Sequence, residues 1–434
     1  MSTYVFSINN YNPIKTASIK LDGITVLAGI NGCGKSTISR WIYYLVNGMH
    51  DFEKKQSSYL INSLISRISR VDRLFRIFSG DTKYREYIEK FQNLENDIDF
   101  DESKLANLFE AFTRQAKKDL SSFIKTASSG QKRRMSYYLA NKQDIDDYDE
   151  LVNSFINSCD VLYNTRIEEY HTAILIRNLS DLKDTIQNEY DEHKSMPKNI
   201  HFEEDGVSLI SKDQFSNPLM LNRAIYIDTP MVISDQMEPA KGKIWDHFLQ
   251  LIENNNKRCD KDEFLQFLIR KSIGGTVELI KDDIGYSQKL YYIRQDDPRP
   301  IKLTDAATGI KTFAYMLRLL ENEWLDEETI LLIDEPEAHL HPQWIVEFAR
   351  ILVLLSKKLG TKIVLACHNP DMVAAIQSIS EREQMSDKTH FYLAEPVADS
   401  SQYNFVDKGN EIGDIFESFN IAMSKIEEYG TPLI

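Results

Sequence analysis

The stretch ITVLAGINGCGKSTISRWIYYLV, residues Ile24–Val46, decides the fold of this 434-residue chain. Ile24–Leu27 is a short apolar run typical of a buried strand. Gly29–Ser36 then matches the pattern G-x-x-x-x-G-K-[ST] at every fixed position. The residues that follow place Ile38, Trp41, Ile42 and Leu45 at helical spacing. A strand, a glycine-rich loop and a helix in this order predict a phosphate-binding loop.

The chemistry of such a loop indicates a nucleotide triphosphate and its magnesium ion, so we expect ATP and Mg²⁺ as ligands. Glycines let the backbone turn tightly, and its N–H groups and the helix dipole then converge on phosphate oxygens. Lys35 is expected to reach the β- and γ-phosphates and to assist catalysis, and Ser36 is expected to bind the metal. The predicted ATP-binding residues of the loop are Asn31, Gly32, Cys33, Gly34, Lys35, Ser36 and Thr37.

A second predicted strand, in ETILLIDEPEAHLHPQW (Glu328–Trp344), ends in an acidic pair. Asp334 is placed to hold Mg²⁺, and Glu335, one residue on, is placed to polarise an attacking water as the catalytic base. An acidic pair after a strand can instead cap the next helix. The complete phosphate loop elsewhere in the chain favours the catalytic interpretation.

A third predicted strand, in KIVLACHNP (Lys362–Pro370), is followed by His368. A single histidine is often a structural residue satisfied by hydrogen bonds. These three motifs, in this order, resemble the ABC/SMC-type ATPase superfamily, and DEPEAHLHP resembles its bacterial OLD-like and RecF-like members. The resemblance implies that His368 contacts the γ-phosphate as a catalytic residue. It also implies an α/β fold, an ABC-type P-loop ATPase head with a mixed sheet core and flanking helices.

Two segments resemble the signature peptide with which these ATPases hold the γ-phosphate of the opposite subunit. TASSGQKRRM, Thr126–Met135, lies roughly two hundred residues before Asp334, whereas the family's signature helix leads almost directly to that strand. ATGIK, Ala307–Lys311, opens an amphipathic segment some twenty residues before Asp334. We therefore assign ATP contacts to Thr308, Gly309 and Lys311, and interpret Thr126–Met135 as a coincidental match. Thr308 stands where the family has serine, Ile310 where it has a second glycine, and Lys311 where it has glutamine.

The coincidental match belongs to a basic stretch, residues 104–142, in a chain whose net charge is −15. Its cations include Arg114, Lys117, Lys118, Lys125, Lys132, Arg133 and Arg134, besides the lysines at its two ends, and they outnumber two acids, Glu110 and Asp119. Arg67, Arg70, Arg73 and Arg76 form a similar cluster. Such a reversal of charge fits a nucleic-acid or partner surface, and it equally fits a solvated helix face.

The motifs predict three parts. Residues 1–50 form the N-terminal half of the head with the phosphate loop, 51–220 a mainly helical insertion, and 221–434 the C-terminal half with the signature, the acidic strand end and His368. One helix is predicted from about Asp147 to His193. The segments GGTVELIKDD and KLYYIRQDD are predicted to form a hairpin that leads to the signature.

Composition limits the function classes. The chain has no apolar run long enough to span a bilayer and no secretion signal, and its four cysteines form no CxxC pair, so we expect a cytoplasmic protein without membrane contact. Asp-x-Asp-x-Asp in Asn96–Ser103 follows no buried strand and is interpreted as a solvated loop. About forty residues follow HFYLAEP, too few for the TOPRIM nuclease domain of OLD-type proteins, and no HNH-like metal arrangement is visible. We therefore expect no nuclease activity in this chain.

The resemblance implies a homodimer or higher oligomer formed through the ATP sites. Short ATPases of this sort resemble those of phage-defence operons, such as Septu- or retron-associated ATPases, which work with a separate effector of nuclease type. One alternative is a DNA-repair or recombination ATPase that acts on DNA directly. A transporter subunit is the other, and it is disfavoured because Ala338–His341 stands where transporters carry Ser-Ala-Leu-Asp.

Overall fold

The computed structural model describes residues 2–96, 100–140, 147–190, 196–228, 243–253, 262–281, 288–419 and Tyr429. The chain divides into two compact units. The head unit comprises Met1–His50 with Leu182–Ile434, and the helical unit comprises Asp51–Asp181. The predicted α/β architecture, a mixed sheet with flanking helices and a large helical insertion, is confirmed.

The chain leaves and re-enters the head unit at neighbouring positions. A Cβ atom at Gly48 would lie 3.0 Å from Ile186 Cγ1 and 3.2 Å from Leu182 Cδ1, so the two crossings pack against each other. Sequence analysis assigned residues 182–220 to the insertion, whereas the structure places Ile200–Glu204 on the sheet of the head unit, paired with Tyr4–Tyr11. The strand Ile200–Glu204 is short and carries no motif, so nothing in the sequence indicated its place in the head unit.

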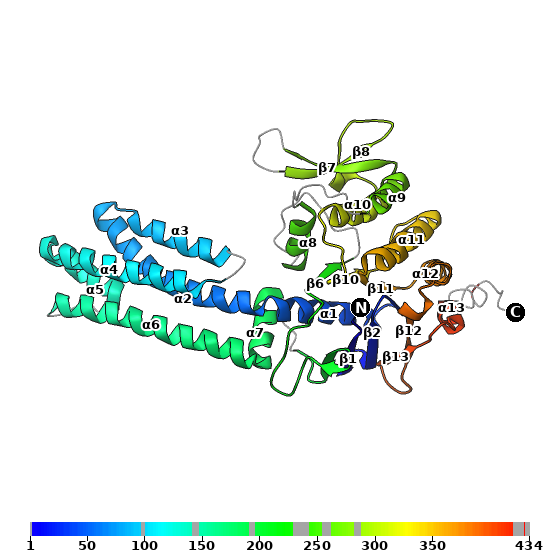
Figure 1. Ribbon diagram of the computed structural model, residues 1–434, viewed down its shortest axis with the longest axis horizontal. Coiled ribbons are helices and arrows are strands. Elements are labelled where there is room, and N and C mark those ends of the chain that lie inside the picture. Colours follow the sequence, from blue (N-terminus) through cyan, green and yellow to red (C-terminus); the bar gives the residue numbers. More distant parts are fainter. Residues whose placement is uncertain are drawn as a thin grey trace. The chain divides into compact units, whose positions relative to one another are not determined.

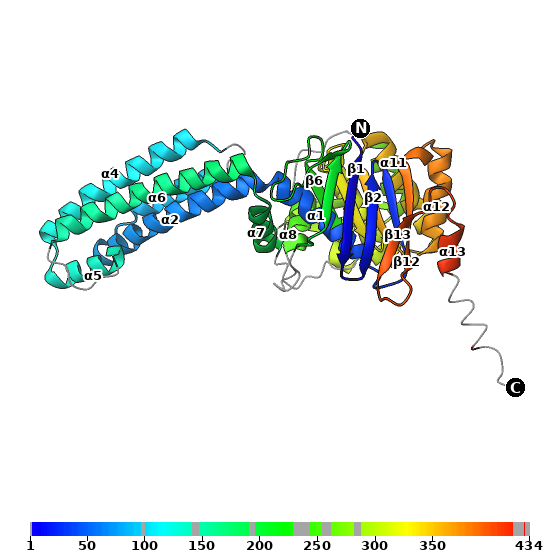
Figure 2. The same ribbon diagram turned by 90° about the horizontal axis from the view of Figure 1, so that it is seen from below.

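One ten-stranded sheet organises the described part of the head unit. Its strands are β1 Tyr4–Tyr11, β2 Ile14–Leu21, β3 Ile24–Ala28, β4 Ile200–Glu204, β5 Val207–Ser208, β6 Arg223–Ile227, β10 Thr329–Asp334, β11 Lys362–Cys367, β12 Thr389–Pro396 and β13 Tyr403–Asp407. Their order is β5-β4-β1-β2-β13-β12-β3-β11-β10-β6, and β12, β3, β11, β10 and β6 are parallel neighbours. Figure 2 shows β1, β2, β13 and β12 side by side. Strands from both ends of the chain therefore meet in one sheet.

Helices cover both faces of the parallel strands (Figure 1). They are α1 Lys35–His50, α7 Leu179–Tyr190, α8 Lys243–Glu253, α9 Glu263–Ile273, α10 Thr308–Glu321, α11 Pro342–Leu359, α12 Pro370–Arg382 and α13 Gly413–Phe419, with short 3-10 turns at Leu303–Asp305 and Ser386–Lys388. Successive strand residues point to opposite faces. Leu331 and Ile333 of β10 join the core formed with α8–α12, so Asp334, one residue on, points to the other face, where α1 packs.

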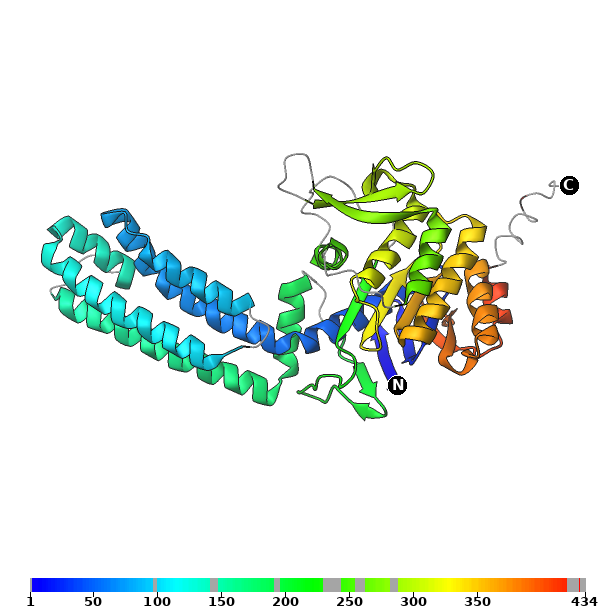
Figure 3. The same ribbon diagram turned by 45° about the horizontal axis from the view of Figure 1, so that its top comes forward.

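A small antiparallel sheet precedes the signature helix α10. It consists of β7 Gly275–Lys281, β8 Gln288–Arg294 and β9 Ile301–Lys302. β7 packs against α9 and α10, and Figure 3 shows the β7–β8 hairpin above these helices. The predicted hairpin is therefore present, with residues 282–287 at its turn outside the described residues.

The helical unit has its own core, built from α2 Phe52–Ser79, α3 Lys83–Asn96, α4 Glu102–Thr126, α5 Ser129–Ala140 and α6 Tyr148–Ile176. Asp101 and Asp147 accept backbone N–H hydrogen bonds at the starts of α4 and α6, as helix caps do. The helix predicted from Asp147 to His193 is interrupted at Arg177, which adopts a left-handed conformation (φ 49°) and ends α6; His193 lies outside the described residues. Apolar periodicity continued across this break and concealed it.

Candidate nucleotide site

Parallel pairing brings the three predicted motifs to one edge of the sheet. β11 lies between β3 and β10, and the register aligns Ala366 with both Asp334 and Leu27. The phosphate loop after β3, the acidic pair at the end of β10 and His368 after β11 therefore emerge side by side. Ligands of open α/β sheets bind at this carboxyl edge.

The phosphate loop has the backbone that its glycines permit. Gly29, Gly32 and Gly34 have φ values of 151°, 83° and 109°, which other residues rarely adopt. A Cβ atom at Gly34 would lie 2.7 Å from Ile14 Cγ1, whereas one at Gly32 would meet no heavy atom within 4 Å. Gly32, like Asn31 before it, therefore faces open space, as a phosphate cradle requires.

The functional side chains of the loop divide into buried and accessible groups. Lys35 Nζ is buried and donates hydrogen bonds to the carbonyl oxygens of Gly29 (2.8 Å) and Ile30 (2.9 Å), which hold the cation across the loop. Cys33 is buried, and burial raises the pKa of its thiol, so this side chain supports the loop from inside. Ser36 is exposed and Thr37 is partly exposed at the start of α1, where both hydroxyls are accessible to a ligand.

Asp334 is buried at 2% exposure, and one of its oxygens is left without a protein partner. Tyr226 on β6 donates its hydroxyl proton to Asp334 Oδ2 at 2.7 Å. Ser36 lies beside the same carboxylate and stabilises its charge, while burial outweighs these contacts and raises the pKa of Asp334. Oδ1 has no hydrogen-bond partner among the described residues. An unpartnered carboxylate oxygen beside a serine hydroxyl fits a hard cation such as Mg²⁺.

The number of protein ligands at this site fits a magnesium ion that is coordinated in part by phosphate oxygens. In the described part of the chain, no group of three His, Cys, Asp or Glu side chains could hold a metal ion by itself. Mg²⁺ commonly takes few protein ligands and completes its shell with water and phosphate oxygens. Ser36 and Asp334 therefore fit an ion delivered with the nucleotide.

A hydrogen-bonded chain that sequence reasoning missed extends from Asp334. Arg40, one turn beyond Ser36 on α1, donates from Nε to the Tyr226 hydroxyl (3.4 Å) and from Nη2 to Asp228 Oδ2 (3.2 Å). Tyr226 lies on β6, outside the three motifs, so no pattern in the sequence assigned it a role. The chain ties α1 to β6 and fixes the Tyr226 hydroxyl toward Asp334.

Glu335 has a strained backbone at the point where the chain leaves β10. Its φ is 51°, and its N–H donates to the Ala366 carbonyl at 2.8 Å. Left-handed conformations of residues other than glycine are costly and occur preferentially at functional sites. The turn leaves the side chain 39% exposed, with Oε1 4.0 Å from His368 Nδ1. The two predicted catalytic side chains therefore lie together at the strand ends.

A small cavity opens next to the phosphate loop. It has a volume of about 110 Å³ and is lined by Tyr11, Asn12, Ser36, Thr37, Arg40, Trp41 and Tyr44. Tyr11 ends β1 and contacts the Trp41 ring edge-on at 5.9 Å between centroids. Tyr11 comes from β1, whereas Trp41 and Tyr44 come from the part of α1 that lines the cavity together with Ser36 and Arg40, so no local pattern in the sequence joined Tyr11 to them.

The predicted signature residues do not contact the phosphate loop of their own chain in any described interaction. Thr308 begins α10, and Gly309 packs against the Trp344 ring, where a Cβ atom would lie 2.5 Å from Cζ3. Lys311 Nζ donates to the Thr304 carbonyl at 2.5 Å, and burial lowers its pKa. The lysine therefore supports the turn before α10 and would have to leave this carbonyl to meet a phosphate.

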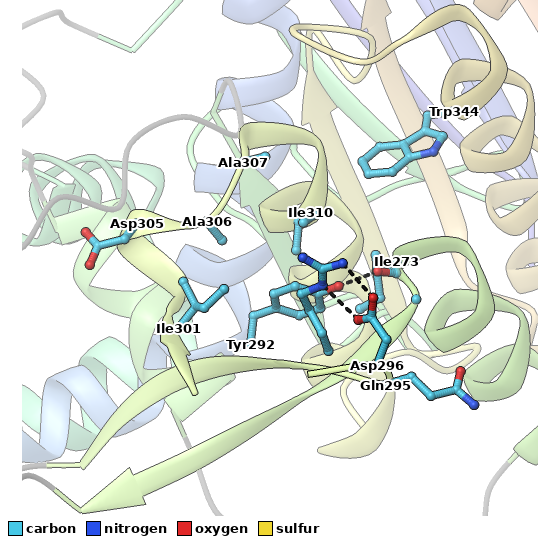
Figure 4. A pocket seen from close by; sticks show the side chains of 12 residues that line it. Ile273, Tyr292, Gln295, Asp296, Ile301, Asp305, Ala306, Ala307, Ile310 and Trp344 are labelled. Atoms are coloured by element: carbon cyan, nitrogen blue, oxygen red, sulfur yellow. Dashed lines mark hydrogen bonds and ion pairs between the residues drawn. The ribbon is translucent and has the colours of Figure 1, made fainter. Parts of the chain in front are cut away.

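A cavity of about 690 Å³ borders the start of the signature helix rather than the phosphate loop (Figure 4). Apolar side chains of Ile301, Ile310 and Trp344 line it, and the ion pair between Arg294 and Asp296 (2.8 Å) closes one side. Ala307, the exposed N-cap of α10, makes no side-chain cap hydrogen bond. The N–H groups at this helix start are thus open to an anion from outside the chain.

The coincidental signature match, Thr126–Met135, lies in the helical unit at the end of α4 and the start of α5. One charge of the basic stretch is neutralised locally, since Arg114 pairs with Glu110, and Lys132 keeps its charge but lies 5.7 Å from the Tyr148 ring centroid. Asp101 of the acidic segment caps α4; Asp97 and Asp99 lie outside the described residues.

Comparisons with known proteins agree with this site. The family described as AAA ATPase domain matches residues 1–373. Septu protein PtuA of Bacillus mycoides is 26% identical over 141 residues, which are 28% of this chain and 20% of that protein, so the match spans a fifth of the relative's length. None of the helices in the described residues is both long and apolar enough to cross a membrane.

Solved structures with a related arrangement include an SMC head domain from Pyrococcus furiosus bound to the C-terminal domain of ScpA (11% identity, TM-score 0.36, 99% of this chain and 100% of that chain). Another is an ABC transporter's ATP-binding cassette in its ADP conformation (9% identity, TM-score 0.34, 98% and 99%). The family match covers most of the chain and includes its phosphate loop, acidic strand end and His368. The chain therefore belongs to the AAA ATPase domain family, and the resemblance to ABC/SMC-type P-loop ATPases, including those of defence systems, is confirmed.

Proposed function

We propose that this ATPase hydrolyses ATP at a site shared between two copies of the chain and that the nucleotide cycle controls a separate effector. The observation that carries the proposal is the convergence of Ser36, Asp334, Glu335 and His368 at adjacent strand ends. In each site, Asn31–Thr37 of one copy would hold the phosphates, and Thr308, Gly309 and Lys311 of the other copy would close over the γ-phosphate.

The described side chains supply the parts of a hydrolytic reaction. Lys35 and the loop N–H groups bind phosphate oxygens, and Ser36 and Asp334 would hold Mg²⁺, which when bound neutralises phosphate charge. Glu335 orients a water for in-line attack and accepts its proton. His368, the first residue after β11, would contact the γ-phosphate beside Glu335. The unpartnered Asp334 oxygen supports the proposed dependence of hydrolysis on Mg²⁺.

The proposed role is that of a sensor or regulatory subunit in a cytoplasmic anti-phage defence complex with a nuclease-type effector on another chain. The similarity of part of the chain to Septu protein PtuA supports this role. ATP binding would join two heads, and hydrolysis would release them, which makes the helical unit a switchable element. Co-purification of the chain with the products of its neighbouring genes tests for the effector.

The shared site is tested by mixing two inactive variants. Lys35→Ala removes the phosphate-loop cation, and Ala307→Asp places a carboxylate at the exposed N-cap of α10, where it caps the helix and repels phosphate. Each variant alone should be inactive. An equal mixture should recover about a quarter of wild-type hydrolysis, because half of the dimers then contain one intact site of two. No recovery in mixtures shown to exchange subunits would contradict a shared site.

A second candidate function, direct action on DNA, is favoured by the surface of α5. This helix carries Arg133 and Arg134, has no acidic residue and exposes Tyr137 at 54%, a combination suited to phosphates and stacked bases. Neutralising Arg134 together with Lys125 and replacing Tyr137 by serine should weaken DNA binding and flatten its salt dependence. Unchanged binding in that variant would exclude the α5 surface as the DNA contact.

A further inference from the structure

Glu337 is a buried carboxylate that neither the phosphate loop nor the acidic pair explains. It lies in the segment after β10, and its side chain is 4% exposed. Its Oε1 atom accepts a hydrogen bond from the backbone N–H of His368 at 2.8 Å and lies 3.2 Å from His368 Nδ1. One carboxylate oxygen therefore holds both the main chain and the ring of a residue that follows a different strand.

The contact with the imidazole has a chemical consequence. A carboxylate accepts hydrogen bonds and donates none, so Nδ1 of His368, 3.2 Å from Oε1, can bond to it only when Nδ1 carries the proton. The ring is then oriented by Glu337 and its other nitrogen, Nε2, is left for a ligand. The His368 side chain is 41% exposed, so the ring is accessible to a ligand although Glu337, which holds it, is buried.

Burial makes this anchor rigid. Oε2 of Glu337 is buried and has no hydrogen-bond partner among the described residues, and the thiol of Cys367, buried beside it, has a pKa raised by burial and then by the Glu337 charge. A buried carboxylate is costly unless it is bonded, so both Oε1 contacts are needed to keep it in place. Rotation of His368 would break one of them.

We propose that Glu337 is a positioning residue for ATP hydrolysis: it fixes the His368 ring and its tautomer so that Nε2 meets the γ-phosphate. This inference rests on the proposed function of His368. Since ADP lacks the γ-phosphate, the geometry points to an effect on hydrolysis and on ATP affinity, with none on ADP affinity. A residue that only stabilised the fold would affect both nucleotides alike.

The test compares Glu337→Ala, Glu337→Gln, His368→Ala and the double variant Glu337→Ala/His368→Ala. Glu381, an exposed acid at the end of the next helix, supplies the matched control Glu381→Ala. Glu337→Ala should lower kcat about tenfold or more, as His368→Ala does, while the Kd of ADP stays within about twofold of wild type. Adding Glu337→Ala to His368→Ala should cause little further loss, because interacting residues are not additive. Glu337→Gln keeps an acceptor oxygen and should restore most of kcat.

The outcomes separate the two proposals. If His368→Ala hydrolyses ATP at the wild-type rate, the proposed role of His368 fails. If His368→Ala is slow but Glu337→Ala is normal, or if their losses multiply in the double variant, the positioning role is overturned. Should Glu337→Ala not fold, ¹⁵N NMR of histidine-labelled wild-type protein decides, because the inference requires a protonated Nδ1 on His368 and an Nε2–H tautomer contradicts it.

Discussion

Asp334 shows how a single residue is prepared for a ligand at the expense of stability. Its carboxylate is buried, one oxygen is held by Tyr226, and the other has no protein partner in the described residues. Burial raises its pKa. In the pH range between the ordinary aspartate pKa and this raised value, the folded protein holds a proton that the unfolded chain has released. The stability of the ligand-free protein therefore falls as pH rises through that range.

We expect Asp334→Asn to raise the thermal unfolding temperature of the ligand-free protein at pH 7, because the variant no longer buries an uncompensated charge. The gain should shrink as pH falls toward the ordinary aspartate pKa and disappear below it, at about pH 3, where the wild-type carboxyl is protonated in both states. The same variant should lose the extra stabilisation that Mg²⁺ with ADP gives the wild-type protein. Thermal scans with and without Mg²⁺ and ADP at both pH values check this, and a variant less stable than wild type at pH 7 would contradict it.

Single residues were predictable where the chemistry is local. Lys35 and Ser36 follow from one contiguous motif, and Asp334 follows from a strand that ends in an acidic pair. Tyr226 and Glu337 were not predictable, because their roles depend on which strand neighbours which and on side-chain contacts 108 and 31 residues away in sequence. A buried tyrosine or glutamate has no sequence pattern that distinguishes it from one in an ordinary core.

The signature helix α10 illustrates how an element is positioned by its packing. Its first turn approaches α11 closely, since Gly309 leaves no room for a side chain beside Trp344. Farther along, Arg318 and Glu321 form a buried ion pair at 2.8 Å, and Arg270 of α9 reaches the same glutamate at 2.7 Å. The contact with Arg270 fixes α10 relative to α9, whereas the Arg318–Glu321 pair lies within α10 itself. The glycine of the motif therefore has a packing role in this chain besides the nucleotide contact that sequence analysis assigned to it.

Gly309→Ala should destabilise the protein by about 1–3 kcal/mol, because its Cβ atom would overlap the Trp344 ring. Adding Trp344→Leu should recover part of this loss by making room for the methyl group. Gly413→Ala is the matched control, since a Cβ atom there would meet nothing within 4 Å. Urea unfolding of the variants measures the effect, and equal stabilities of the Gly309 and Gly413 variants would show that α10 can move away from α11.

The elements were predicted better than their arrangement. Apolar runs indicated β3, β10 and β11, and helical periodicity indicated α10 and a helix of the insertion. Strand order was not predictable, because hydrogen bonding between β13 and β2 joins residues at opposite ends of the sequence. The end of α6 was missed since Arg177, rather than a glycine or proline, adopts the terminating left-handed conformation.

At the scale of the whole molecule, the head unit is interrupted at one place. Gly48 packs against Leu182 and Ile186, so the chain can be rejoined there over a short distance. Among the described residues, the ten-stranded sheet contains strands of the head unit only, and the helical unit has a core cluster built from its own helices. Each unit therefore has the buried apolar residues that independent folding requires.

Replacing residues 51–178 by a flexible linker of about five glycine and serine residues should give a head that unfolds cooperatively and is stabilised by Mg²⁺ with ATP. Circular dichroism and thermal scans measure both properties. Lys35→Ala in the shortened protein is the control and should abolish the nucleotide effect. A shortened protein that does not fold would show that the head depends on the helical unit.

The sheet order also constrains how the protein can be made. β3, which leads into the phosphate loop, has β11 and β12 as its two neighbours, and both are encoded more than three hundred residues later. During synthesis, both edges of this apolar strand stay unpaired until β11 and β12 have been made, which takes roughly 20–70 seconds at ordinary elongation rates. Until then a nascent chain can fold its helical unit but cannot assemble an ATP site. A product truncated before Lys362 would therefore keep β3 with both edges unpaired, and such a strand is prone to aggregation.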